Sequence, residues 1–141
     1  MNDTLVLLPQ PRTLTPGAGE FQLDPNLPIV LAPAPELRAT GERLRAALLS
    51  AAAGAWPLAA FAAAPGGIRI QVDSAAVSEA QSYRLTIAPE QITITAHDAS
   101  GAFYGICTLI QIVEQRGAKL PCLEIHDWPD FPVRGVKLDI S

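Results

Sequence analysis

Apolar and polar residues alternate strictly along three segments in the second half of the chain. Apolar side chains occupy every second position from Ile68 to Val72, from Tyr83 to Ile87 and from Ile92 to Ala96. A period of two residues predicts half-buried strands. Residues 88–91, which include Pro89, separate the last two segments by a short turn. The pattern therefore predicts a β-hairpin over residues 83–96.

Other apolar runs predict further strands. Residues 5–8 form a short apolar run, and Phe21 and Leu23 alternate with polar neighbours. Residues 28–32 form a continuous apolar run bounded by prolines, which is typical of a strand covered on both faces. Residues 120–126 predict the last strand of this part of the chain.

A period of 3.6 residues predicts a first helix that begins at about residue 35. Pro35 and Glu36 suit a first helical turn, and Gly54 and Pro57 follow where a helix should end. Apolar residues then lie on one side of the helix, opposite charged ones. The residues of this apolar side are Leu37, Leu44 and Leu48.

A second helix is predicted after the hairpin. Either Asp98 or Ser100 can accept the free amide hydrogens of its first turn, and Gly117 suits the position after its end. Apolar residues surround most of its circumference, so it needs cover on two sides. We expect Leu109 and Ile112 to leave an exposed apolar patch that makes the chain self-associate. The predicted apolar face consists of Phe103, Ile106, Ile110 and Val113.

Composition and charge narrow the function classes. The chain has 141 residues, of which 49% are apolar and 17% charged, as expected of a compact soluble domain. Its net charge is −4 and no Lys/Arg run occurs, so neither nucleic acid nor an anionic membrane is an expected partner. Residues 5–8 are too few for a signal-peptide core. We therefore expect a cytoplasmic protein, or a secreted one if a leader was removed.

Few residues are suited to metal or thiol chemistry. His97 and His126 are the only histidines, and Cys107 and Cys122 the only cysteines. A zinc site needs three or four protein ligands in a recognisable spacing, which these four residues lack. We predict no metal site and no cofactor, and we interpret both cysteines as ordinary buried thiols. A thiol redox function would have only these two cysteines to support it.

One glycine-containing segment looks like a phosphate-binding loop at first sight. Residues 100–105 contain two glycines, but no Lys follows the second one as phosphate binding requires. We instead interpret Ser100 as a helix cap, and Gly101 and Gly105 as sites of close packing.

Carboxylate pairs matter because sugar hydrolysis usually needs two of them. The chain contains no Asp-Glu dipeptide. Asp127, Asp130 and Asp139 lie near its end, the first two in a proline-containing segment, residues 127–132. We interpret Asp127 and Asp130 as turn residues of a linker.

Several motifs together resemble the family 20 glycoside hydrolases, the β-N-acetylhexosaminidases. The resemblance covers residues 82–141, with a weaker match at residues 7–12. The most specific part is the linker Asp-Trp-Pro-Asp-Phe-Pro at residues 127–132, which leads into Arg-Gly and Leu-Asp-x-Ser. Cys107 stands where members often have glutamine, and Asp130 where many have arginine. The matching blocks are Tyr83–Ile87, Ile92–Ala96, Ala99–Gly105, Thr108–Gln111 and Ile125–Ser141.

The resemblance implies an α/β (α+β) fold, with a mixed or antiparallel sheet and two helices on one face. Such a domain has the outline of a zinc protease without the metal ligands. The implied organisation is an N-terminal domain over residues 1–126, a linker over 127–132, and the first strand of a catalytic (β/α)8 barrel over 133–141. A barrel of this type needs roughly 250 residues.

The resemblance also implies an activity for the parent protein, the retaining hydrolysis of terminal N-acetylhexosamine. The substrate's acetamido oxygen acts as the nucleophile there, and an Asp-Glu pair further along the barrel assists it. That pair is absent from the 141 residues, so we expect the chain alone to be inactive, with the barrel as its partner. By its place in the family motif, at the first barrel strand, only Arg134 matches a substrate-binding residue, and its guanidinium would donate to sugar hydroxyls there. The alternative is an exposed arginine that merely follows the linker. Asp139 would be a structural residue inside the barrel.

An alternative is a stand-alone module that binds carbohydrate or protein. Trp56, Phe61 and Trp128 are the aromatic residues that could stack on a sugar, and they lie in segments predicted to be connectors. Binding of chitooligosaccharides by the chain itself would favour this alternative.

Overall fold

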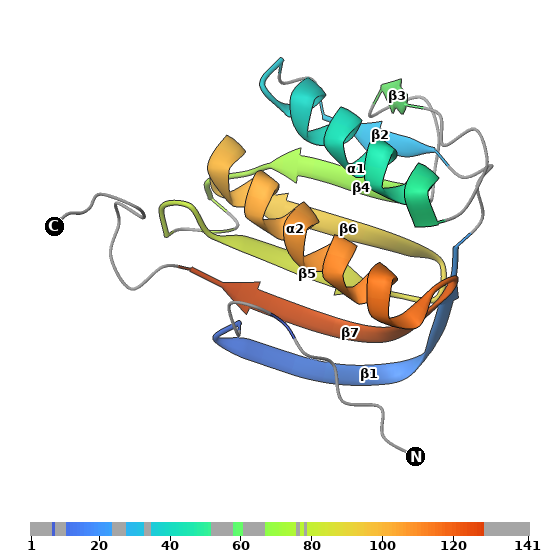
Figure 1. Ribbon diagram of the computed structural model, residues 1–141. Helices are drawn as coiled ribbons and strands as arrows, with labels where there is room; N and C mark the ends of the chain where they lie inside the picture. The colour runs from blue at the N-terminus through green and yellow to red at the C-terminus, as the bar shows by residue number, and fades with distance from the viewer. Residues whose placement is uncertain are drawn as a thin grey trace, which may run out of the picture.

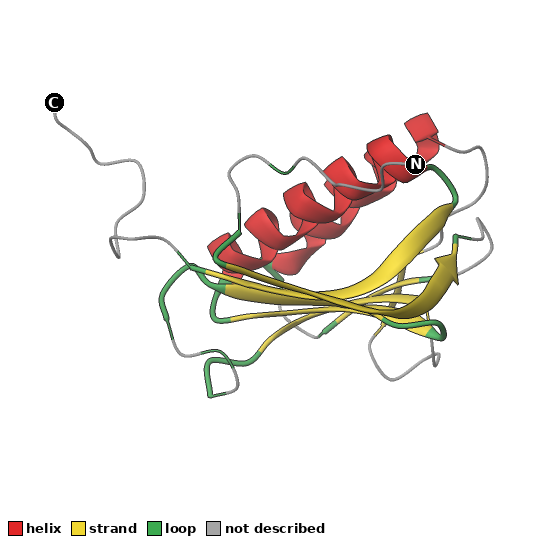
Figure 2. Ribbon diagram, turned by 90° about the horizontal axis from the view of Figure 1, so that it is seen from below, coloured by secondary structure: helices red, strands yellow, loops and turns green. Residues whose placement is uncertain are grey.

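The computed structural model describes residues 7, 11–23, 28–32, 35–51, 58–60, 67–75, 77 and 79–128. Over these residues, seven strands form one sheet in the order β1-β7-β5-β6-β4-β2-β3, and both helices lie on the same face of it (Figures 1 and 2). This two-layer arrangement confirms the predicted fold class. The elements are β1 (Thr13–Gln22), β2 (Ile29–Leu31), α1 (Leu37–Ala51), β3 (Leu58–Ala60), β4 (Gly67–Val72), β5 (Tyr83–Ile87), β6 (Gln91–Ala96), α2 (Ala99–Arg116) and β7 (Lys119–Asp127).

The sheet is mixed. The predicted hairpin is confirmed, because β5 and β6 pair antiparallel with Leu85 opposite Ile94. On one side of this hairpin, β7 pairs antiparallel with β5 and with β1. On the other side, β4 runs parallel to β6, and β2 runs parallel to both β4 and β3. The helix α1 follows β2 and supplies the crossover that parallel strands require.

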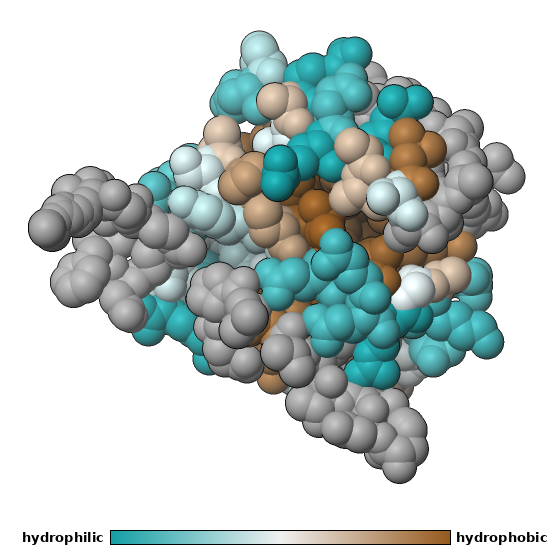
Figure 3. All heavy atoms as spheres, in the orientation of Figure 1, coloured by the Kyte–Doolittle hydropathy of each residue, from teal (hydrophilic) through white to brown (hydrophobic). Residues whose placement is uncertain are grey.

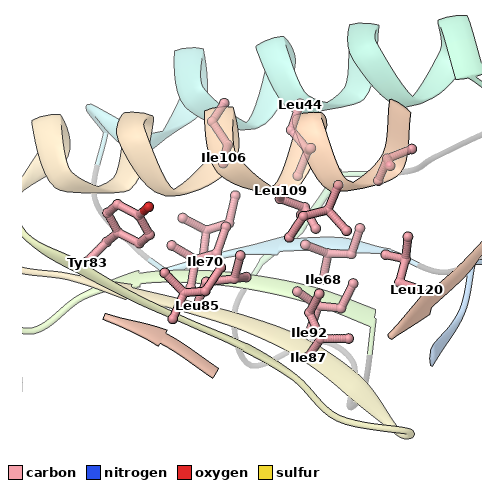
Figure 4. Close-up of a cluster of buried hydrophobic side chains, with 14 of the residues drawn as sticks. Leu44, Ile68, Ile70, Tyr83, Leu85, Ile87, Ile92, Ile106, Leu109 and Leu120 are labelled. Carbon is pink, nitrogen blue, oxygen red and sulfur yellow. The ribbon is translucent and has the colours of Figure 1, made fainter. Parts of the chain in front are cut away.

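The two faces of the sheet differ sharply in polarity. The face under the helices carries aliphatic side chains such as Ile70, Leu85 and Ile92, which are fully buried (Figure 4). The opposite face carries polar side chains in two rows across the strands, as the alternation predicts. These rows are Thr13, His126, Arg84, Thr95 and Gln71, and Thr15, Glu124, Thr86, Thr93 and Arg69.

The edge strand β1 is longer than the sequence indicates. A short strand was expected around Phe21 and Leu23, but β1 begins at Thr13 and pairs with β7 along its length. The register shifts between Pro16 and Glu20, so the strand contains an irregularity there. Proline and glycine are tolerated at an edge, where one side of the strand has no ladder to maintain. Because these residues interrupt the alternation of apolar and polar side chains, the sequence pattern does not reveal the full length of β1.

Other predicted strands are confirmed or lie outside the described residues. In β2, the adjacent residues Ile29 and Val30 are both buried, as expected for a strand covered on two faces. The apolar run 5–8 lies outside the described residues except for Leu7, which is buried. Trp56 and Phe61 also lie outside them, as do Gly54 and Pro57. The short strand β3 was not predicted.

The helix α1 packs its predicted face onto the sheet. Leu37, Leu44 and Leu48 are buried there. Gly41 lies over β2, where a Cβ would come within 2.8 Å of the Leu31 side chain. A glycine in mid-helix costs helix stability, but here it lets α1 approach the strand closely. Neither helix in the described ranges is long and apolar enough to cross a membrane.

The helix α2 is capped by Asp98 and not by Ser100. The Asp98 carboxylate accepts a hydrogen bond from the Gly101 amide at 2.8 Å, while Ser100 is exposed. Gly117 ends the helix with a φ of 72°, as expected of a glycine in this position. The predicted close packing is confirmed at Gly101, where a Cβ would overlap the backbone carbonyl of Ser82.

Candidate functional site

The predicted substrate-binding residue cannot be placed in the fold. Arg134 lies outside the described residues, as do Asp130 and Asp139. The interpretation of Asp127 as a turn residue is wrong, because Asp127 is the last residue of β7, opposite Tyr83. Its carboxylate is buried and accepts a hydrogen bond from the Arg12 amide at 3.1 Å. Trp128 is therefore the first residue after β7.

Each of the two histidines contacts a different neighbour. His97 contacts the Val77 carbonyl oxygen through Nδ1 at 2.8 Å. His126 lies on the polar face of β7, where its Nε2 is 3.8 Å from a carboxylate oxygen of Glu79. Within the described part of the chain, no group of three or more His, Cys, Asp or Glu residues is arranged to hold a metal ion.

The two cysteines are both free thiols and lie on different elements. Cys107 is half-buried on α2, and Cys122 is buried on β7. Burial raises the pKa of Cys107 above its ordinary value of 9.0, and Arg43 only partly offsets this rise. Burial also raises the pKa of Cys122, and the nearby carboxylates of Glu90 and Glu20 add to the rise. Because the thiolate is the reactive form, these environments disfavour thiol redox chemistry.

Of the three aromatic residues that could stack on a sugar, only Trp128 lies in the described part of the chain. Its ring is contacted by two side chains. The Arg12 guanidinium lies 4.8 Å from the ring centroid, and the centroid of the His126 ring lies 4.8 Å away as well. A sugar would have to displace these contacts to stack on the indole ring, which argues against Trp128 as a binding platform.

The residues of α2 that are exposed differ from those that the sequence predicts. Leu109 and Ile112 are fully buried, so the prediction that they form an exposed patch is wrong. Phe103, placed on the buried face by the sequence, is 37% exposed, and Ile110 is partly exposed. Hydrophobic atoms reach the surface over the helix layer among hydrophilic ones (Figure 3).

Small residues explain this rotation of α2. A Cβ at Gly105 would come within 2.8 Å of the Ile94 side chain and 3.3 Å of the Tyr83 ring. Gly101 and Gly105 therefore mark the side of the helix that comes closest to the sheet, and Leu109 and Ile112 continue that side. Phe103 is turned away from it. Hydropathy alone does not reveal which arc of an apolar helix lies nearest to the sheet.

One side of α2 carries exposed and half-buried residues, and this side is here called the outer stripe. The helix α1 contacts it through Arg43, whose guanidinium lies 5.3 Å from the centroid of the Phe103 ring. The stripe thus combines apolar groups with a neighbouring cation. Three- and four-residue spacing places its members on one side of the helix. They are Phe103, Cys107, Ile110 and Glu114.

Comparison with known proteins identifies the family. The family model for glycosyl hydrolase family 20, domain 2, matches residues 4–128. The chain belongs to glycosyl hydrolase family 20. A β-hexosaminidase from Porphyromonas gingivalis is 32% identical over 145 aligned residues, which cover 95% of this chain and 18% of that protein. The resemblance to family 20 seen in the sequence is confirmed.

Solved structures agree with this assignment. The N-acetyl-β-hexosaminidase from Streptomyces plicatus has a TM-score of 0.75 and 28% identity, covering 86% of this chain and 26% of that one. The family 20 β-N-acetylhexosaminidase from Streptomyces coelicolor has a TM-score of 0.73 and 26% identity over the same shares. The family 20 chain described here thus spans about a quarter of the length of these enzymes.

One group of contacts was not visible in the sequence. Arg12 meets Asp127 and Trp128 although 115 and 116 residues separate them. Arg12 ends the weakly matching segment at residues 7–12, which gives no sign of a contact with the far end of the chain. Only the pairing of β1 with β7 brings it to the end of the sheet.

Proposed function

We propose that this domain is the non-catalytic N-terminal part of a retaining β-N-acetylhexosaminidase. In the whole protein, a barrel would hydrolyse terminal N-acetylhexosamine, with the substrate's acetamido oxygen as nucleophile. The membership of family 20 carries this proposal. The 141 residues contain no Asp-Glu dipeptide, which agrees with a catalytic pair located elsewhere.

The outer stripe is the proposed contact surface for that barrel. In the family that the sequence resembles, both helices lie between the sheet and the barrel. The stripe supports this role because Phe103 is 37% exposed although it is a large apolar side chain. Burying it against a partner would remove apolar surface from water. The polar face of the sheet would then remain on the solvent side.

The proposal is tested on the protein encoded by the whole natural gene. We expect that protein to hydrolyse p-nitrophenyl N-acetyl-β-glucosaminide and the 141-residue chain to leave it intact. Hydrolysis by the 141-residue chain would contradict the proposal, as would a natural gene that encodes no barrel.

Arg134 is the proposed contact of this chain with the substrate. In the whole protein we expect Arg134→Ala to lower kcat/KM about tenfold to a hundredfold, mainly through KM, because a hydrogen bond from a charged donor is lost. Arg134→Lys keeps the charge but loses the planar set of donors, so it should recover only part of the activity. Arg38→Ala is the control, since Arg38 is exposed on α1 and pairs only locally with Glu42. Equal activity of the Arg134→Ala variant would exclude the contact.

The binding-module alternative predicts that the isolated chain binds chitooligosaccharides. We expect no binding in a calorimetric titration, because the Arg12 and His126 side chains contact the Trp128 ring. Saturable binding that Trp128→Ala abolishes would favour the module instead.

A further inference from the structure

The end of β7 is held by side-chain contacts in addition to its pairing with β1 and β5. The β5–β7 ladder ends with Tyr83 opposite Asp127, and the β1–β7 ladder ends with Thr13 opposite His126. Trp128 is therefore the first residue after the paired strand. Strand and helix ends fray unless other contacts hold them. At this end, a side chain from the other end of the sequence supplies such contacts.

Arg12 contacts the two residues at this exit. Its backbone amide donates to a carboxylate oxygen of Asp127 at 3.1 Å. Its side-chain Nε donates to the Trp128 carbonyl oxygen at 2.8 Å, and its guanidinium lies over the Trp128 ring. The same arginine thus holds the backbone and the side chain of Trp128. These groups are called the exit clamp below.

Further contacts secure the same place from the neighbouring strands. The Thr13 hydroxyl donates to the His126 carbonyl oxygen at 3.2 Å. The His126 ring packs against the Trp128 ring at an interplanar angle of 56°. Trp128 is therefore contacted by His126 of β7 and by Arg12, which precedes β1.

The chemistry of the clamp requires arginine. A guanidinium is planar, so one side chain can donate a directed hydrogen bond and also stack on an aromatic ring. A lysine ammonium carries the same charge but has no Nε–H and no plane to stack. The geometry therefore depends on more than the charge of Arg12.

We propose that Arg12 is a positioning residue that holds Trp128 in a fixed orientation against the end of the sheet. With the clamp closed, Trp128 moves with the sheet as one body. This role goes beyond the proposed function and holds whether or not the parent protein is a hexosaminidase.

Fluorescence anisotropy decay of Trp128 tests the proposal in the 141-residue chain. Trp56→Phe leaves Trp128 as the single indole, since the chain has two tryptophans. With Arg12 present, we expect the decay to follow the rotation of the whole domain. In Arg12→Ala, a second component on the nanosecond scale of loop motion should appear. Arg12→Lys should show this component too, and Arg38→Ala should not.

Two results would overturn the proposal. One is an unchanged decay in a folded Arg12→Ala variant, with folding checked by circular dichroism. The other is full recovery in Arg12→Lys, which would make charge alone responsible.

A second measurement needs no variant. Because the Arg12 amide donates to a buried carboxylate, we expect its hydrogen exchange in the unaltered chain to be at least tenfold slower than that of an unprotected amide. Exchange at the unprotected rate in the folded chain would mean that the clamp is open, even if the Arg12 variants fail to fold.

Discussion

At the scale of single residues, Asp98 joins two parts of the chain. One carboxylate oxygen accepts from the Gly101 amide at the start of α2, and the other accepts from the Gln81 amide at 3.0 Å. Gln81 has a φ of 61°, a conformation that costs energy for a residue with a side chain. The Asp98 carboxylate therefore caps the helix and also holds a strained turn in place.

We expect Asp98→Ala to lower the free energy of unfolding by about 1–2 kcal/mol, the usual cost of losing a helix cap, and more if the turn also opens. Ser100→Ala is the matched control and should change it by less than about 0.5 kcal/mol, because Ser100 is exposed. Urea denaturation followed by circular dichroism measures both. A larger loss for Ser100→Ala than for Asp98→Ala would reverse the assignment of the cap.

The cysteines give a second prediction at this scale. Their raised pKa values mean that at pH 8 a smaller fraction of each thiol is thiolate in the folded chain than in the unfolded chain. We expect a disulfide reagent to react more slowly with folded than with urea-unfolded protein, and Cys122 to react last. Cys107→Ser identifies the slower thiol. Equal rates in the folded and unfolded chain would contradict the raised pKa values.

At the scale of elements, α2 shows how packing selects one arc of an apolar helix. Its apolar residues surround most of the circumference, but Gly101 and Gly105 allow the closest approach to the sheet. Leu109 and Ile112 therefore become core residues, and Phe103 stays outside. The neighbouring helix α1 reaches the second side of α2, where Arg43 contacts Phe103.

This arrangement predicts very different costs for two truncations on α2. Leu109→Ala should destabilise the domain by about 2–5 kcal/mol, because it leaves a cavity in the core. Phe103→Ala should cost less than about 1 kcal/mol, since its ring is partly in water already. Thermal or urea denaturation of both variants distinguishes the two faces. Similar losses for both would mean that Phe103 is also a core residue.

At the scale of the whole molecule, the two faces have opposite characters. Over the described residues, both helices lie on one face of the sheet (Figure 2). The other face is polar, whereas the helix layer presents the outer stripe. An exposed aromatic group beside an arginine is typical of contact surfaces between proteins. A barrel of the same protein is the proposed occupant of this surface.

If nothing covers the outer stripe, we expect the 141-residue chain to self-associate through it at high concentration. Sedimentation velocity should show a larger species that Phe103→Ser reduces and that Leu49→Ser does not. Leu49 is the suitable control because it is 40% exposed on α1 and lies outside the stripe. A strictly monomeric chain, or an equal effect of both substitutions, would exclude association through this surface.

The family and most of the local structure are determined by the sequence. The hairpin of β5 and β6, the strand β4 and both helices follow from periodicity and capping, which depend on residues a few positions apart. The motifs at residues 82–141 indicated family 20. The assignment of Arg134 stays a prediction.

Only the tertiary structure decided which distant groups meet. The pairing of β1 with β7 brings Arg12 to Asp127 across 115 residues, and the approach of α2 to the sheet decides that Leu109 is buried and Phe103 is not. Closing so long a loop costs chain entropy that no single contact offsets. Such contacts form because the whole sheet and its core stabilise them together, so neither end of the sequence carries a local signal of the other.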